Sequence, residues 1–286
     1  MTPFRRVVLA LAAALSACVS GGGRRTTPTP ATATATGVVL NTAGPWKVGA
    51  AAKSEKVAIV TEATVAISGD TVVRTDTLRA TLAASYTWTG TAPRRVDGQL
   101  TDYRVAVGTS APVAPPGLRL ARPFSATAAP GTSSLLFTLP TEASACTDPS
   151  LSSVQGLQDA WVAVPSTLSV GQHWEDTVHT LSCRDRVPLT GTSVRWFVVR
   201  GAEVENGQRV LVVIERSSRG RLTGEGNQFG EKVTIAGESS GTLTYRFDPV
   251  AGQFVRASGA SVLSFALKSS RRNQSVRQNS VLSLTW

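Results

Sequence analysis

Both histidines of the chain fall in one short polar run, His173 to His179, which also contains Glu175 and Asp176. Histidine and carboxylate side chains are common zinc ligands, so the run is a candidate metal site. If the run is a β-strand, His173, Glu175 and His179 share a face, but the histidines then lie about 20 Å apart, at roughly 3.3 Å per residue. One ion cannot bridge that distance, and the helical zinc pattern with histidines four residues apart is missing. We therefore expect a polar strand, no metal and no cofactor.

The string from Gly237 to Gly241, G-E-S-S-G, matches the G-x-S-x-G pattern of serine hydrolases. In those enzymes the serine lies on a sharp turn between a strand and a helix, and an acid and then a histidine follow it in the chain. The sequence predicts no helix after Gly241, and no histidine follows His179. We therefore interpret Ser239 as part of a Gly-Ser turn or bulge in a strand, and we predict that the protein is not an enzyme.

Cys18 ends a segment that is typical of bacterial export signals, with basic residues at Arg5 and Arg6 and an apolar run from Val7 to Leu15. The run is too short to span a bilayer core of roughly 30 Å, which needs about 20 apolar residues as a helix. Leu15-Ser16-Ala17-Cys18 resembles the lipobox of the bacterial lipoprotein family. The resemblance implies that residues 1–17 are a cleaved signal peptide and that Cys18 carries diacylglycerol. An additional acyl chain on the new amino terminus would make the anchoring firm. The alternative is an ordinary secretory signal with a chance cysteine.

Residues 18–50 are expected to form a lipidated flexible tether, because the stretch from Gly21 to Thr36 has no large apolar side chain. A flexible coil of about 30 residues has a root-mean-square reach near 30 Å. Val19 stands where an aspartate would favour the inner membrane, so the resemblance implies the outer membrane, with the protein facing the periplasm. The formal net charge of +10 falls to +8 when Arg5 and Arg6 leave with the signal. Because export separates the chain from nucleic acid, we expect no nucleic-acid partner.

Cys146 and Cys183 are the two remaining cysteines, and an exported compartment permits a disulfide. We predict that they pair, which would stabilise the fold by roughly 3 to 4 kcal/mol in the chain-entropy model. The alternative is two buried free thiols.

Residues 51–286 are expected to form a single, mainly β domain. Polar and β-branched residues alternate from Glu55 onward, and Asn206-Gly207 lies between two apolar runs, as in a β-hairpin turn. About ten antiparallel strands in a long meander curl under their own twist, which predicts a curved sheet or an open half-barrel. We expect the strands at about 55–68, 71–88, 99–107, near Phe124, and at 133–139, 172–183, 192–201, 208–222, 231–248, 252–268 and 274–286.

One α-helix is predicted near residues 149–163, because Asp148 and Pro149 supply a cap and a first-turn proline. Its apolar stripe should rest on the inner face of the sheet and line a possible apolar groove, and its members are Leu151, Val154, Leu157 and Trp161. This layout resembles the LolA-type half-barrel lipoproteins and carriers, and also uncharacterised envelope lipoproteins. The resemblance is one of architecture, without a diagnostic motif. It implies a groove under the helix for an acyl chain.

Two further features lie near the end of the chain. Four basic residues surround the last predicted hairpin, and they suit either an anionic lipid or sugar phosphate or, more simply, a solvated turn: Lys268, Arg271, Arg272 and Arg277. Trp286 resembles the C-terminal aromatic signal of outer-membrane β-barrels. Only 6% of the residues are aromatic and many strands are rich in Thr and Ser, so a last strand that closes the sheet is the preferred interpretation.

Together these features predict a non-catalytic lipoprotein of the cell envelope, a membrane-tethered β domain that binds or scaffolds. The alternative is a carrier or binder of a lipid or other apolar ligand in the helix-covered groove, and the third possibility is a component of a transmembrane β-barrel. A carrier keeps an unfilled apolar cavity, whereas a scaffold packs it solid. The sequence leaves this choice open and names neither a ligand nor a protein partner.

Overall fold

The computed structural model describes residues 44–49, 54–69, 73–89, 95–118, 120, 123–128, 135–137, 146–147, 149–184, 186–228 and 230–286. The predicted signal peptide, Cys18 and the predicted tether up to residue 43 lie outside these ranges.

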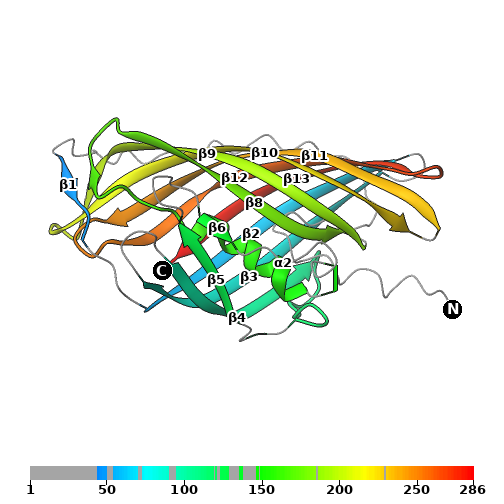
Figure 1. Ribbon diagram of the computed structural model, residues 1–286, viewed down its shortest axis with the longest axis horizontal. Helices are drawn as coiled ribbons and strands as arrows, with labels where there is room; N and C mark the ends of the chain where they lie inside the picture. Colours follow the sequence, from blue (N-terminus) through cyan, green and yellow to red (C-terminus); the bar gives the residue numbers. More distant parts are fainter. Residues whose placement is uncertain are drawn as a thin grey trace.

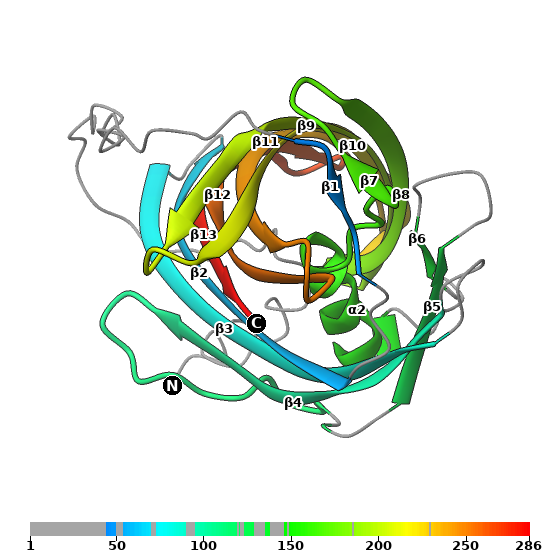
Figure 2. The ribbon, with the colours of Figure 1, turned by 90° about the vertical axis from the view of Figure 1, so that its left-hand side faces the viewer.

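The described residues form a long antiparallel sheet of eleven strands (Figure 1). Its strands are β2 (Ser54–Gly69), β3 (Val73–Thr89), β4 (Arg95–Val107), β5 (Pro123–Ala128), β6 (Leu135–Phe137), β8 (His173–Arg184), β9 (Val187–Glu205), β10 (Arg209–Gln228), β11 (Glu231–Asp248), β12 (Gln253–Lys268) and β13 (Asn273–Thr285). Every predicted strand has a counterpart. Viewed end-on, the sheet curls into an open half-barrel around a helix, which confirms the predicted fold class (Figure 2).

The pairing of β13 with β2 determines where the half-barrel opens. These strands come from opposite ends of the domain, and they pair from Gln274 with Gly69 to Thr285 with Ala58. The strand order is therefore β6-β5-β4-β3-β2-β13-β12-β11-β10-β9-β8. The two edge strands, β6 and β8, flank the helical segment in the sequence. The meander is therefore interrupted at the helical segment, between β6 and β8, and β2 and β13 pair with each other in the middle of the sheet. The helix lies beside the opening (Figure 2).

The turn between β9 and β10 has the predicted chemistry. Asn206 and Gly207 have φ angles of 53° and 73°, which are the left-handed values that a type I′ hairpin turn requires at both central positions. Asparagine and glycine tolerate this conformation better than other residues. The local sequence therefore fixes the register at which these two long strands begin to pair.

The helical segment is shorter than predicted. An α-helix, α2 (Pro149–Gln155), continues as a single 3₁₀ stretch, η2 (Gly156–Ala160), and Trp161 is already extended, with φ −114° and ψ 98°. The prediction of a regular helix to residue 163 is wrong in this last turn. The carbonyl oxygens of Gln158 and Trp161 accept hydrogen bonds from Arg195 of the sheet, so tertiary contacts replace the next helical turn.

A two-residue strand pair lies outside the main sheet. Strand β1 (Trp46–Lys47) pairs with β7 (Thr167–Leu168), and Trp46 packs against the main core. This part of the chain belonged to the predicted tether, which therefore ends earlier than residue 50. Burial of the Trp46 side chain against apolar neighbours is the physical reason.

Two apolar cores fill the inside of the half-barrel. The first core cluster surrounds the helix, and it contains Tyr245, Phe247 and Leu243, which share one face of β11 as predicted. The second core cluster lies toward the other end and consists of Val65, Ile67, Val187, Leu189, Val233, Ile235, Leu263, Phe265, Leu267 and Val276. Tight packing within each cluster is the main source of stability for such a sheet.

The G-E-S-S-G string lies between these two cores. It forms the uninterrupted middle of β11, where Gly237 pairs with Leu222 and Phe265, and Ser239 pairs with Gly220 and Leu263. The prediction of a turn or bulge at this string is therefore wrong, whereas the prediction of a strand is confirmed. A Cβ on Gly237 would lie 2.4 Å from the Cβ of Phe265, so glycine permits a close approach of β12 that keeps the strand regular.

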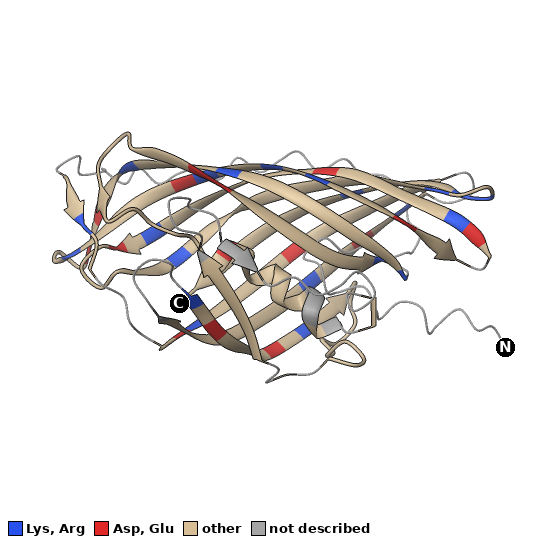
Figure 3. Ribbon diagram, in the orientation of Figure 1, with Lys and Arg blue, Asp and Glu red and all other residues tan. Residues whose placement is uncertain are grey.

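The outward faces of the strands are polar, and charges of both signs are spread along them (Figure 3). Exposed ion pairs join neighbouring strands, among them Lys232 to Glu225, with an N–O distance of 2.9 Å, and Arg221 to Glu238, at 3.7 Å. Within the described ranges, no helix has the length and apolar character that crossing a membrane requires.

Candidate ligand-binding site

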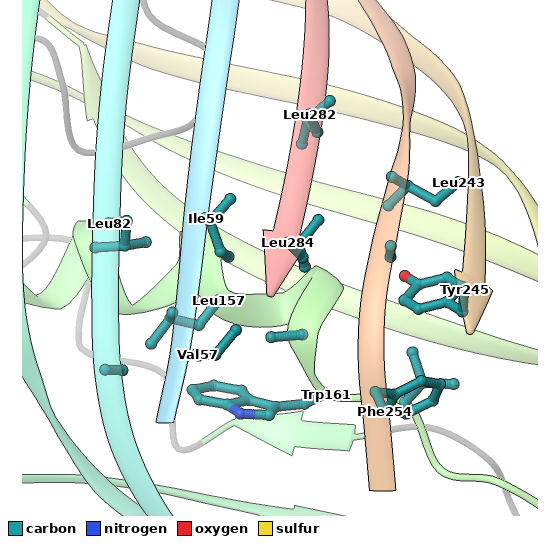
Figure 4. Packing of buried hydrophobic residues seen from close by; sticks show 14 of the residues in the cluster. Val57, Ile59, Leu82, Leu157, Trp161, Leu243, Tyr245, Phe254, Leu282 and Leu284 are labelled. Atoms are coloured by element: carbon teal, nitrogen blue, oxygen red, sulfur yellow. The ribbon is translucent and has the colours of Figure 1, made fainter. Parts of the chain in front are cut away.

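The apolar side of the helical segment is packed against the inner wall of the sheet. Val154, Leu157 and Trp161 are buried members of the first core cluster, and Trp161 and Leu157 have no exposed surface. Figure 4 shows Leu157 and Trp161 beside Val57 of β2. The ring centroid of Trp161 lies 5.0 Å from that of Phe124. Three of the four predicted groove residues therefore come together, and protein side chains fill the space around them.

The fourth predicted groove residue is Leu151, whose side chain lies outside the described part of the structure.

A buried polar network, formed by Asp159, Asp176, Arg195, Arg216 and Tyr245, holds the end of the helical segment. Arg195 donates from Nε and Nη2 to the two carboxylate oxygens of Asp176, at 2.6 and 2.5 Å. Its Nη1 also donates to the Gln158 carbonyl oxygen at 2.8 Å. Two neighbouring strands, β8 and β9, thereby position the backbone of the helical segment.

The next two strands complete this network. Arg216 of β10 forms an ion pair with Asp159 of η2, and the Tyr245 hydroxyl of β11 donates to the Asp159 carbonyl oxygen at 2.9 Å. Burial raises the pKa of Tyr245 to about 12, against the opposing charge of Arg216, so the phenol stays a donor at neutral pH. Strands β8, β9, β10 and β11 thus each contribute one side chain to the network that holds the end of the helical segment.

Sequence reasoning missed this network. Neither Arg195 nor Arg216 was singled out from the sequence, yet the alternation places Arg195 on the same face as Phe197 and Val199, both of which are buried. A charged residue between inward apolar positions was the signal that could have identified it. Its partner on another strand could not be identified without the register.

The disulfide between Cys146 and Cys183 is present, as predicted, with a Cα–Cα distance of 4.9 Å. It ties the chain just before α2 to the end of β8. The helical segment is therefore held covalently at its start and by the buried polar network at its end.

A cavity of about 90 Å³ lies on the other side of the helical segment. The segment contributes Gln155 and Gln158, β8 contributes Thr180, Ser182, Cys183 and Arg184, and β9, β10 and β12 close the space. The wall opposite the helix is apolar and includes Leu222, Leu263 and Phe265. This cavity separates the helix from the second core cluster, to which Leu263 and Phe265 belong.

The polar groups of the cavity differ in charge and in hydrogen-bonding role. Gln155 is 5% exposed, and its Oε1 accepts no hydrogen bond from the described residues; the same holds for Oε1 of Gln158. The guanidinium carbon of Arg184 lies 5.0 Å from the centre of the Phe265 ring, in a cation–π geometry. The described lining of the cavity therefore combines one arginine, two glutamines and an apolar wall.

The histidine run lies elsewhere. It forms the first half of β8, as predicted, and His173, Glu175 and His179 are all exposed. Nδ1 of His179 lies 3.2 Å from the Thr192 hydroxyl on the next strand. Among the residues that the structure describes, no group of three or more His, Cys, Asp or Glu side chains is placed to hold a metal ion.

Trp286 and the basic residues around the last hairpin include contacts to other strands of the sheet. Trp286 follows the last strand, and its Nε1 donates to the Tyr86 hydroxyl on β3 at 2.8 Å. In the basic group of the β12–β13 hairpin, Arg271 forms an ion pair with Glu231, at 2.6 Å. The hairpin tip is thereby joined to the start of β11.

Comparison of the sequence with protein-family models finds no match, and none is found among curated proteins. The function of the chain must therefore be argued from its own residues.

Proposed function

We propose that the protein is a non-catalytic lipoprotein of the cell envelope, a binding domain tethered to the outer membrane and facing the periplasm. In this proposal Cys18 carries the lipid anchor, and the following segment holds the half-barrel clear of the lipid surface. The cavity beside the helical segment is the binding site. The membrane is the first partner of the protein, and a small ligand is the second.

The observation that carries the proposal is the rigid mounting of the helix beside a cavity. The disulfide at Cys146 and the pairing of Arg195 with Asp176 hold the helical segment on both sides of Gln155 and Gln158. Side chains on a segment that is held in this way lose little conformational entropy when a ligand binds. A preformed cavity with few polar groups is therefore well suited to binding.

The packing beneath the helix favours this proposal over a carrier of long acyl chains. Trp161 and Leu157 are fully buried among residues of the sheet. An acyl chain would have to displace these side chains, at a cost comparable to the loss of their buried contacts. The free volume lies instead beside Gln155, in a cavity of about 90 Å³.

The outward face supports a domain in water rather than one spanning the bilayer. Arg221 and Glu238 are paired on the outside of β10 and β11, with side chains 85% and 77% exposed. A basic side chain on the lipid-facing side of a barrel strand costs about 2–4 kcal/mol at the membrane midplane. This free-energy cost is avoided only where water surrounds the charged side chains.

The anchor is tested with the full chain and a Cys18→Ser variant in a two-membrane bacterium, labelled with an alkyne analogue of palmitate. We expect the native chain to carry the label and to sediment with the outer membrane, and the variant to be released into the soluble periplasmic fraction. An unlabelled native chain in the soluble fraction would overturn the anchoring.

The binding role is tested by native mass spectrometry of the full chain in detergent. A stoichiometric small molecule on the chain supports that role, and a clean unliganded mass opposes it.

A further inference from the structure

We infer that the turn between β11 and β12 docks on the lipid surface of the membrane and sets the orientation of the half-barrel there. The docking element is the tip of this turn, residues 249–252, and its outermost side chain is Val250. This inference rests on the proposed lipid anchor, to which it adds a second, non-covalent contact with the membrane. Only the tip enters the lipid, so the half-barrel itself stays outside the lipid surface.

The tip is apolar and protrudes into solvent. Val250 is 87% exposed, which makes it the most exposed large apolar residue in the described ranges. Its neighbours in the tip, Pro249, Ala251 and Gly252, carry no charge. Val204, which is 51% exposed, adds an apolar side chain near the end of β9. Such side chains gain free energy when they move from water into the boundary between lipid headgroups and acyl chains.

The backbone amides of the tip are hydrogen-bonded within the protein. Oδ1 of Asp248 accepts from the amides of Val250 and Ala251, at 3.0 and 2.9 Å. The Gly252 amide donates to the Asp248 carbonyl oxygen at 2.9 Å, and the proline of the turn has no amide hydrogen. An unpaired backbone donor is costly in lipid. Because every amide hydrogen of residues 249–252 already has an acceptor, the tip can leave water without that cost.

The part of the chain that leads to Cys18 joins the domain beside this tip. The Gly49 amide donates to the Pro249 carbonyl oxygen at 2.8 Å, and β1 lies at the same end of the sheet as the β9–β10 and β11–β12 turns (Figure 1). Residues 19–43 separate Cys18 from the domain, and a flexible coil of about 25 residues has a root-mean-square reach of roughly 28 Å. Strand β10 has 20 residues, or about 65 Å at roughly 3.3 Å per residue. The anchor therefore keeps this end of the sheet, and not the opposite end, near the lipid.

The charges around the tip are compatible with docking. Arg209 donates to the Asp248 carboxylate at 2.8 Å, and Arg256 forms an ion pair with Glu205, so these charges are compensated. Lys47 of β1 is exposed at the same end and would lie among the lipid phosphates.

The anchor makes a contact of this size sufficient. Burial of one valine favours the docked state only roughly tenfold to a hundredfold, which would not recruit a free protein to a membrane. A flexible tether holds the tip at an effective concentration of about millimolar, so a weak contact is populated.

The test places an environment-sensitive fluorophore on the native full chain, reconstituted in vesicles of phosphatidylethanolamine and phosphatidylglycerol. Val250→Cys and Val73→Cys each supply one thiol, because Cys146 and Cys183 are paired and lipidation blocks Cys18. Val73 is the matched control, a valine that is 68% exposed at the opposite end of the sheet. We expect the label at residue 250 to shift its emission to shorter wavelength and to be quenched by spin-labelled lipid, and the label at residue 73 to remain in water. Equal emission and quenching at the two positions would overturn the inference.

A second comparison tests Val250 itself. The label is placed through Gln208→Cys on the β9–β10 turn, which adjoins the tip because Arg209 contacts Asp248. Val250→Asp should lower the docked-to-free ratio, measured by lipid quenching at residue 208, roughly tenfold or more. Val73→Asp should leave that ratio unchanged. Native quenching in a Val250→Asp chain that is folded by circular dichroism would overturn the role of the turn; if that variant does not fold, the comparison of residues 250 and 73 decides.

The outcomes separate this inference from the proposed anchor. A native chain that stays with the vesicles and takes up no label at Cys18, while residue 250 remains in water, would keep the anchor and overturn the docking. Labelling of Cys18 in the native chain would overturn the anchor. The label at residue 250 in a Cys18→Ser chain with saturating vesicles then decides the docking by itself: lipid quenching supports it, and its absence overturns it.

Discussion

Arg195 and Asp176 form a doubly hydrogen-bonded ion pair inside the half-barrel, with side chains that are 2% and 0% exposed. The same guanidinium also donates to the backbone of the helical segment, at the Gln158 carbonyl oxygen. Loss of one partner of a buried ion pair leaves a buried charge uncompensated, which is strongly destabilising. The stability of the sheet therefore depends on this pair, which also holds the helical segment in position.

Asp176→Ala should lower the free energy of unfolding by about 3–5 kcal/mol, because Arg195 then remains charged and buried without its carboxylate. Urea unfolding of the full chain followed by circular dichroism measures this. The control is Glu215→Ala, which removes the partner of Arg200 in an exposed pair and should cost at most about 1 kcal/mol. Similar losses in both variants would contradict a special role for the buried pair.

Trp161→Ala should cost about 3–5 kcal/mol of unfolding free energy, since the side chain is fully buried in the first core cluster. Trp196→Ala is the matched control, because Trp196 is 41% exposed on the outside of β9, and its loss should be below about 1 kcal/mol. Urea midpoints of the two variants make the comparison. A Trp161 variant as stable as the control would show that the helix is not packed as described.

Replacement of both Cys146 and Cys183 by serine should lower the stability by about 3–4 kcal/mol, because the unfolded chain regains the entropy of the closed loop. The measurement is again urea unfolding, with the unreduced native chain as the reference. A thiol assay on that native chain, denatured without reductant, should find neither cysteine reactive. Two reactive thiols would contradict the bridge.

The stability should depend on pH through Asp248. Burial raises the pKa of its carboxyl, but hydrogen bonds from the Ala251 amide, the Arg209 guanidinium and the Val250 amide outweigh it, and the pKa lies below the ordinary value of 3.8. A carboxyl with a lowered native pKa stabilises the fold above its unfolded pKa, and that contribution is lost as the pH falls through the native pKa. The stability difference between the native chain and Asp248→Asn should therefore shrink between about pH 5 and pH 2.

The control for this titration is Asp97→Asn, which changes an aspartate in an exposed pair with Arg95. Its difference from the native chain should stay small across the same pH range. A difference for Asp248→Asn that stays constant with pH would show that the carboxyl contributes nothing through its charge.

Local sequence patterns predicted the strands of the main sheet, the hairpin at Asn206-Gly207 and one helix. The pairing of Cys146 with Cys183 was predicted instead from the number of cysteines and the exported compartment. Alternation of apolar residues, left-handed turn positions and a first-turn proline act over a few residues of chain, so they can be recognised locally. The predicted apolar stripe of the helix was recovered for the same reason, because Val154, Leu157 and Trp161 lie on one side of a short segment.

The pairing of β2 with β13, the end of the helix and the surroundings of Arg195 become known only from the folded domain. These depend on which of several compatible strand edges meet, and residues 58 and 285 are brought together by closure of the whole sheet. The cavity between Gln155 and Phe265 arises in the same way, since its walls come from strands far apart in the chain. Local preferences specify the elements, whereas burial of side chains between distant elements specifies the site.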